Sequence, residues 1–228
     1  LDKAGNLVPG TNATAEEMCT IGDAFTGVGH GTIEIISDWL DDKKELAWIE
    51  HIARTTGRPI TTLTGTGVQG IWSLADTLAK DGLTLRPQVG ARPASILMTL
   101  EGTINPMRQH PAYREIQDLP LDDRRAQLRD PTFRQRVLTE EKILPRNKDA
   151  QRMMNNYETI WVMDEALSYE PSAADSVATK ALEQGVDPLE VIMDTFAEGS
   201  PLLVLFGKYP GDLEAQRLMI ENPLSVFG

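Results

Sequence analysis

Residues 32–89 read TIEIISDWLDDKKELAWIEHIARTTGRPITTLTGTGVQGIWSLADTLAKDGLTLRPQV, and this stretch decides the fold. Short runs rich in β-branched residues at 32–37, 59–64 and 83–89 predict strands. The segments between them carry apolar residues at helical spacing, and Gly57 and Gly82 are typical helix stops. Such β-α-β-α-β alternation predicts an α/β fold with a parallel sheet covered by helices.

The rest of the chain suggests three segments. Residues 1–93 contain the β/α units, and five prolines then divide residues 94–156 into short helices and turns without a clear strand. Apolar runs in 157–228 are expected to return to the main body, with helices and a last strand beginning at 224–227. Insertions of the kind expected at 94–156 commonly carry lids over active sites.

The composition restricts the class of partner. The chain has 22 Lys and Arg against 34 Asp and Glu, a formal charge of −12, which disfavours nucleic acid as a partner. Residues 104–156 carry eleven basic and eight acidic side chains, so this segment has a local net charge of +3. Such a charge is typical of a solvated, Arg-rich helical insertion, or of a surface that attracts carboxylates. Cys19 is the single cysteine and no apolar run could span a bilayer, so we expect a cytoplasmic protein without membrane contact.

The sequence G-x-G-x-x-G at Gly65, Gly67 and Gly70 follows a predicted strand and opens a predicted helix. Backbone N–H groups in such a turn can hold a pyrophosphate, so a nucleotide-binding α/β domain is one hypothesis. The next strand, however, supplies Arg86 and Gln88 where a dinucleotide site needs an acidic residue. The other interpretation is a glycine turn that lets a helix pack closely on a strand.

Polar residues at the strand ends are the candidate site. In parallel α/β folds, active sites form at the carboxyl ends of the strands, where this sequence places Asp38, Thr64 and Gln88, with Arg92 just beyond. Arg92 is suited to pair with a substrate carboxylate, or else to bridge to a neighbouring side chain. His110 in the irregular insertion is a further candidate for lining a substrate pocket. The sequence contains no metal-binding histidine pair and no nucleophile elbow.

Several motifs, in this order, resemble one family. They are RTTGRPIT (54–61), QVGARP (88–93), LEGTINP (100–106), HPAYRE (110–115), LRDP (128–131), GVDP (185–188) and NPLSVFG (222–228). Together they are similar to the N-acyl-D-amino-acid deacylase (D-aminoacylase) branch of the amidohydrolase superfamily. The resemblance implies a hydrolase of non-peptide C–N bonds, in which a zinc-bound hydroxide attacks a small-molecule amide on a (β/α)₈ barrel.

On this resemblance the chain would be a partial (β/α)₈ TIM-type barrel, about strands 5 to 8, with a helical insertion. The family places metal-ligand histidines at the ends of its fifth and sixth strands, where this sequence has Ser37-Asp38 and Thr62-Leu63-Thr64. Asp38 is the one replacement ligand available there. We therefore expect zinc only in an intact enzyme, an inactive isolated piece, and self-association through exposed sheet edges. A non-catalytic barrel relative that binds acidic small molecules is a further alternative.

Overall fold

The computed structural model consists of two compact units. Unit 1 comprises Leu1–Ala91 and Glu214–Gly228, and unit 2 comprises Arg92–Leu213. The structure describes residues 13–37, 39, 41–65, 67–68, 70–145, 148–163, 168–206 and 213–228.

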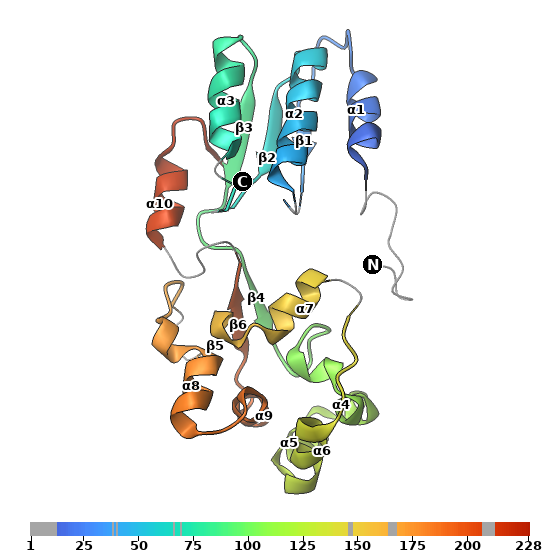
Figure 1. Cartoon of the computed structure of the whole chain (residues 1–228), viewed down its shortest axis with the longest axis vertical. Helices are drawn as coiled ribbons and strands as arrows, with labels where there is room; N and C mark the ends of the chain where they lie inside the picture. Colours follow the sequence, from blue (N-terminus) through green and yellow to red (C-terminus); the bar gives the residue numbers. More distant parts are fainter. Residues whose placement is uncertain are drawn as a thin grey trace. The chain divides into compact units, whose positions relative to one another are not determined.

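Unit 1 contains a four-stranded parallel sheet in the order β1-β2-β3-β7 (Figure 1). The strands are β1 (Ile33–Ile35), β2 (Ile60–Leu63), β3 (Leu85–Val89) and β7 (Val226–Phe227). The order along the sheet therefore follows the order along the chain, and β7 adds next to β3 after the whole of unit 2. The predicted α/β fold with a parallel sheet is confirmed.

Local sequence signals begin and end the helices of unit 1. These are α1 (Ala15–Asp23), α2 (Asp42–Thr56), α3 (Gly70–Lys80) and α10 (Leu213–Glu221). The Thr14 hydroxyl accepts a hydrogen bond from the Glu17 N–H and the Asp41 carboxylate one from the Lys44 N–H, so both N-termini are capped. Gly57 ends α2 with φ +62°, a left-handed conformation that glycine adopts without strain.

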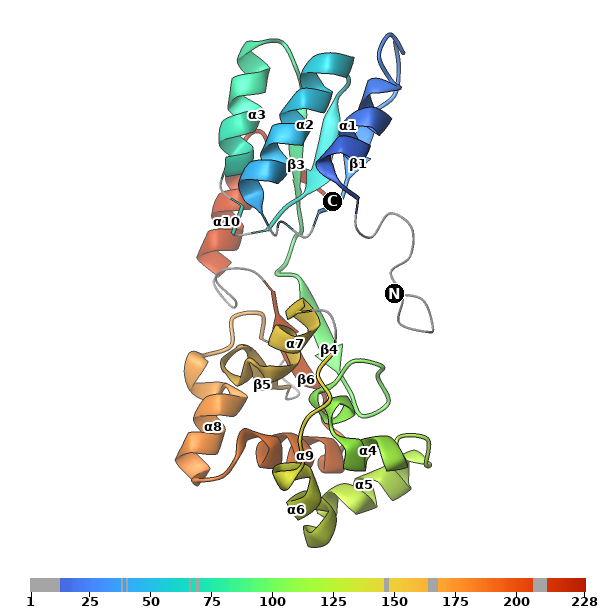
Figure 2. The ribbon, with the colours of Figure 1, turned by 45° about the vertical axis from the view of Figure 1, so that its right-hand side comes forward.

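The helices α1, α2 and α3 lie side by side over one face of this sheet (Figure 2). Ile35, Ile60 and Leu85 point from the strands into this layer, where they form a core with Ile49 and Ile52 of α2. Because side chains alternate along a strand, the intervening residues point to the opposite face.

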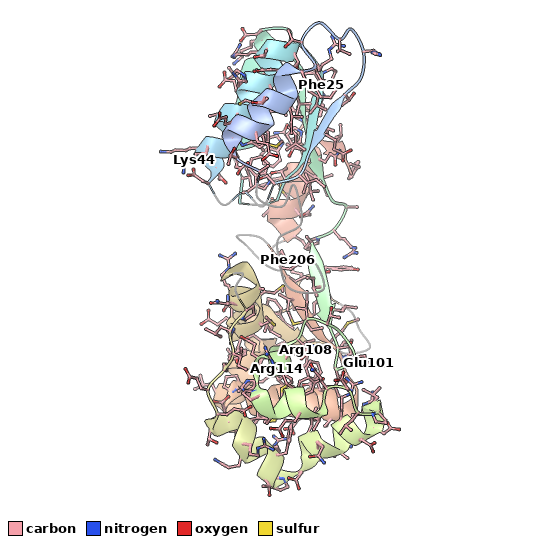
Figure 3. All side chains as sticks on the ribbon, turned by 90° about the vertical axis from the view of Figure 1, so that its right-hand side faces the viewer. Phe25, Lys44, Glu101, Arg108, Arg114 and Phe206 are labelled. Carbon is pink, nitrogen blue, oxygen red and sulfur yellow. The ribbon has the colours of Figure 1, made fainter. Side chains whose placement is uncertain are left out.

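That opposite face is open. Among the described residues no helix packs on it, and its side chains include Glu34, Ile36 and Leu63, of which Ile36 is 78% and Leu63 45% exposed. Helices and strands of unit 1 accordingly appear as two layers when seen edge-on (Figure 3). The sheet is thus half-covered, with an apolar and charged surface on one side.

Unit 2 contains a three-stranded antiparallel sheet, β4-β6-β5. Its strands are β4 (Ser95–Met98), β5 (Ile160–Val162) and β6 (Leu202–Leu205). The expected boundaries differ from this arrangement in two respects. The segment 94–156 does contain a strand, β4, and the strands of 157–206 join its antiparallel sheet rather than the parallel one, with β6 paired to β4 and β5 paired to β6. Of the described elements that follow β4, α10 and β7 return to unit 1.

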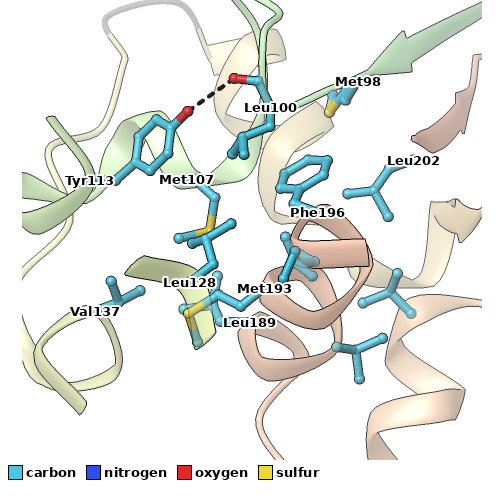
Figure 4. Packing of buried hydrophobic residues seen from close by; sticks show 14 of the residues in the cluster. Met98, Leu100, Met107, Tyr113, Leu128, Val137, Leu189, Met193, Phe196 and Leu202 are labelled. Carbon is cyan, nitrogen blue, oxygen red and sulfur yellow. Dashed lines mark hydrogen bonds between the residues drawn. The ribbon is translucent and has the colours of Figure 1, made fainter. Parts of the chain in front are cut away.

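Helices pack against this second sheet around a large apolar core (Figure 4). Phe196 and Met193 of α9 meet Met98 and Leu202 of the strands in this core, and the Tyr113 hydroxyl donates to the Leu100 carbonyl at 3.0 Å. The helices of unit 2 are α4 (Pro111–Ile116), α5 (Leu121–Arg129), α6 (Pro131–Thr139), α7 (Lys148–Asn155), α8 (Val177–Gln184) and α9 (Pro188–Glu198), with 3₁₀ turns at Pro106–Gln109, Tyr157–Thr159 and Ala173–Asp175. None of the described helices has the length and apolar character needed to cross a membrane.

Candidate functional site

The carboxyl ends of the parallel strands meet at one edge of the unit 1 sheet, as expected from the sequence. There the Thr64 N–H donates to the Gln88 carbonyl at 3.0 Å, which places these two candidate residues on neighbouring strands. The Gln88 carboxamide Nε2 donates to Glu34 Oε1 at 3.4 Å across the open face. Two of the predicted site residues are therefore neighbours, whereas Asp38, the possible metal ligand, lies outside the described residues.

Trp39 contributes to this edge and was not predicted. Its backbone adopts φ +53°, the one positive value among the described non-glycine residues, and its N–H donates to the Ser37 hydroxyl at 3.1 Å. The indole Nε1 donates to the Leu63 carbonyl at 3.0 Å, so the ring is fixed at the end of β2. A left-handed conformation at a bulky residue is costly and is concentrated at functional sites.

Thr64 carries an unpartnered polar group. The residue is 7% exposed, and its hydroxyl Oγ1 is buried without a hydrogen-bond partner among the described residues. Thr64 shares the helix-facing side of β2 with Ile60 and Thr62, both fully buried. A buried hydroxyl without a protein partner is rare in folded proteins, so Thr64 is a candidate for binding a polar group.

The glycine motif divides into two roles. A Cβ at Gly70 would lie 2.8 Å from Leu46 Cδ1, so Gly70 is explained by the close packing of α3 on α2. A Cβ at Gly65 would meet nothing within 4 Å, so packing does not require glycine there. Gly67 lies in the turn between them. Since Arg86 and Gln88 also replace the acidic residue of a dinucleotide site, the close-packing interpretation is the better supported.

Arg92 lies in unit 2, whereas Thr64 and Gln88 lie in unit 1. Its Nη1 donates to the Ser95 hydroxyl at 3.1 Å, and its guanidinium lies 5.5 Å from the centre of the Tyr169 ring. These contacts within unit 2 match the alternative expectation that Arg92 pairs with its neighbours.

His110 is buried in unit 2 rather than lining an open surface. The residue is 1% exposed, and neither ring nitrogen has a hydrogen-bond partner among the described residues. Burial, followed by the positive charge of Lys142, lowers the pKa of His110 to about 4, although the Glu140 carboxylate lies 3.5 Å from Nδ1. That carboxylate is already engaged, because it accepts the Ala112 N–H at the start of α4. At neutral pH the imidazole is thus uncharged.

Arginines of the insertion mostly bond within unit 2. Arg124 donates to the Leu100 carbonyl at 2.8 Å, and Arg129 donates to the Ala197 carbonyl. Arg134 forms an ion pair with Asp194 at 2.6 Å and Arg136 one with Glu115 at 2.7 Å. The arginines that give this segment its positive charge therefore stabilise unit 2. This favours an Arg-rich helical insertion over a surface that attracts substrate carboxylates.

The described residues contain no group of three or more His, Cys, Asp or Glu side chains placed to hold a metal ion. Of the remaining histidines, His30 is exposed and His51 contacts the Asp23 carboxylate at 3.0 Å on the surface of unit 1. The candidate site is accordingly the carboxyl edge at Trp39, Thr64 and Gln88, where the Gln88 carboxamide lies beside the Glu34 carboxylate and the Thr64 side chain points to the helix-facing side.

Comparison with known proteins adds no relative, because no family model, curated protein or solved structure matches this chain.

Proposed function

We propose that unit 1 is an arc of a parallel (β/α) barrel, and that its carboxyl edge binds the substrate of an amidohydrolase acting on N-acyl-D-amino acids or related amides. The observation that supports this most is the arrangement of the sheet. Its four parallel strands follow the chain order, and its described helices cover one face only. An open doubly wound sheet instead reverses strand order and carries helices on both faces.

The family resemblance supplies the reaction class, and the edge supplies the binding groups. Hydrolases built on such barrels bind substrate at the carboxyl ends of the strands. There the Gln88 carboxamide provides a neutral hydrogen-bonding group on the open side of the sheet, the Thr64 hydroxyl provides one at the end of β2 on the helix-facing side, and the Trp39 ring provides an apolar surface. These groups suit an amide and its acyl chain better than a highly charged ligand.

The residues present do not fit the zinc that the family implies. Zinc sites use three or four His, Cys or carboxylate ligands, and the described part of unit 1 brings no such group together. The proposed contribution of this chain is therefore substrate positioning. We assign no chemical step to its residues, and we expect no hydrolysis by the 228-residue protein supplied with zinc.

Binding of an N-acyl-D-amino acid tests the proposal directly. We expect the 228-residue protein to bind N-acetyl-D-methionine more tightly than its L enantiomer in calorimetric titration. Thr64→Val and Gln88→Leu should each weaken binding by about tenfold, because each removes a hydrogen bond. Thr77→Val is the matched control, since the Thr77 hydroxyl bonds only within α3, to the Ser73 carbonyl.

The titration has clear contrary outcomes. Equal binding of both enantiomers, or equal loss in Thr77→Val, would contradict a substrate site at the edge. Hydrolysis by this chain with zinc would contradict the positioning role. Titration with NAD tests the alternative hypothesis of a nucleotide-binding domain. That hypothesis requires NAD to bind and Gly67→Ala to abolish the binding. The hypothesis of a non-catalytic barrel relative requires the protein to bind acidic small molecules, and requires Arg92→Ala to remove that binding.

A further inference from the structure

A lysine of unit 2 lies among neutral groups. Lys142 Nζ donates to the Asn155 side-chain oxygen Oδ1 at 3.2 Å and to the Tyr157 hydroxyl at 3.0 Å, and it lies 5.6 Å from the centre of the Tyr157 ring. Within the described part of the chain, Lys142 forms no ion pair with a carboxylate. Its charge therefore stays uncompensated, and after burial it is the next largest cause of the lowered pKa of His110, about 4.

A buried residue fixes the position of Lys142. Gln109 is 1% exposed, and its carbonyl accepts the N–H of Ile143, the next residue, at 2.7 Å. The side-chain oxygen of Gln109 accepts from Asn155 Nδ2 at 2.9 Å, which turns Oδ1 of the same amide toward Lys142. The chain at Lys142 and the end of α7 are thus held by one buried anchor, so the ammonium group is preorganised.

Two polar hydrogens at this place remain without an acceptor among the described residues. The ammonium group of Lys142 has three N–H donors, of which Asn155 and Tyr157 accept two. The Tyr157 oxygen accepts from Lys142, so its own O–H is still available. One N–H and one O–H on neighbouring atoms can donate to the two oxygens of a single carboxylate, and such charge-assisted hydrogen bonds are strong.

An open hollow adjoins these donors. Its lining residues are Leu144, Gln151, Arg152 and Asn155, the last of which also contacts Lys142. It lies where residues 142–145 run past α7, which is labelled in Figure 2, and Gln151 donates to the Pro145 carbonyl across it. Leu144 is 52% exposed and gives the hollow an aliphatic wall. A positive charge therefore stands beside an apolar surface.

We propose that this hollow binds a small aliphatic carboxylic acid in its ionised form, with the carboxylate on Lys142 and Tyr157 and the chain against Leu144. All of these residues belong to unit 2, so the site is separate from the substrate edge of the proposed function. An anion without a chain, such as inorganic phosphate, would use the two donors but would leave Leu144 without a contact. The aliphatic chain therefore distinguishes the proposed ligand.

Titration with sodium hexanoate at neutral pH tests this site, followed by the backbone amide signals of the isotope-labelled protein. We expect saturable shifts at residues 142–145 and 151–157 and none in α3, with weaker binding of acetate and of inorganic phosphate. Lys142→Met should weaken hexanoate binding by about tenfold, because it removes the charge and keeps the length of the side chain. Tyr157→Phe should weaken it by about fivefold, because the ring stays and one donor is lost. Lys43→Met, which removes an exposed lysine of unit 1, is the control and should leave affinity unchanged.

The contrary results are equally specific. Absence of shifts at residues 142–145, or full affinity in Lys142→Met, would overturn the site. Acetate binding as tightly as hexanoate would contradict the contact with Leu144, and tighter binding of phosphate would contradict the carboxylate. Urea unfolding checks that each variant folds. If Lys142→Met does not fold, full affinity in Tyr157→Phe overturns the proposal instead. Because N-acetyl-D-methionine is titrated separately against variants of unit 1, failure of either proposal leaves the other standing.

Discussion

The two sheets differ in how completely the chain covers them. In unit 2 every residue of the central strand β6 is buried, although Leu97 of the neighbouring β4 is 52% exposed. In unit 1 the described helices cover one face of the parallel sheet, and Ile36 on the other is 78% exposed. Purely parallel sheets are normally covered on both faces. The comparison indicates that the large core of unit 2 lies on one face of its sheet with the central strand buried, whereas the unit 1 sheet leaves its second face exposed.

The largest expected effect is on the completed core of unit 2. Phe196→Ala removes a ring that is 1% exposed and should lower the free energy of unfolding by about 3–5 kcal/mol. Trp161 is the tryptophan of unit 2, so its fluorescence during urea unfolding can report on this unit. The control is Phe206→Ala, since Phe206 is 40% exposed and should cost much less. Equal losses in the two variants would show that the unit 2 core is not packed as described.

Acid sensitivity is the next expected difference between the units. The pKa of His110 is about 4 in the folded chain against an ordinary 6.5, so the unfolded chain binds more protons between these values. Stability should therefore fall as pH falls from about 6.5 to about 4, by roughly 3 kcal/mol from this group. Above that window the full contribution is present. Urea unfolding followed at Trp161 across this pH range measures the change.

Two histidine variants identify the group responsible. His110→Gln should flatten the dependence, because the buried group then no longer titrates. His51→Gln changes a surface histidine beside Asp23 and should leave the dependence unaltered. An unchanged slope in His110→Gln would contradict the buried, uncharged imidazole.

The smallest expected effects are at helix N-termini, one in each unit. The Asp130 carboxylate accepts the Phe133 N–H at 2.8 Å at the start of α6, and the Thr14 hydroxyl accepts the Glu17 N–H at 3.1 Å at the start of α1. Asp130→Ala and Thr14→Ala should each cost about 1 kcal/mol, measured by thermal unfolding. Asp130→Asn should retain most of the cap. If Asn and Ala at position 130 cost the same, the side chain does not cap α6.

Sequence periodicity predicted unit 1 well because its contacts are local. Strands 32–37, 59–64 and 83–89 correspond to β1, β2 and β3, and the helix expected at 70–80 is α3. β1 pairs with β2 and β2 with β3, so alternation indicates this part of the topology, whereas the pairing of β3 with the distant β7 has no local signal.

Unit 2 could not be predicted in the same way. The pairing of β4 with β6 joins residues 95–98 to residues 202–205, and no local signal encodes a contact over that separation. The four-residue β4 also lies beside a proline-rich segment that predicts turns.

The candidate site shows a similar division. Thr64 and Gln88 could be placed from the rule that parallel strands end at one edge, and the structure makes them neighbours. Trp39 was missed because nothing in a tryptophan's identity signals a positive φ. His110 and Arg92 were expected near a substrate because of their chemistry. In the structure His110 is buried in unit 2, and Arg92 donates to the Ser95 hydroxyl within the same unit.

The account depends most on the parallel order of the unit 1 sheet, and the β3–β7 pair is its decisive contact because β7 follows all of unit 2. Cross-strand nuclear Overhauser effects in the isotope-labelled protein measure it. We predict contacts between the backbones of Gln88 and Val226 and of Val89 and Phe227, in the parallel pattern. If residues 226–227 contacted β1 instead of β3, or paired with β3 in an antiparallel pattern, the parallel sheet order β1-β2-β3-β7 would be contradicted.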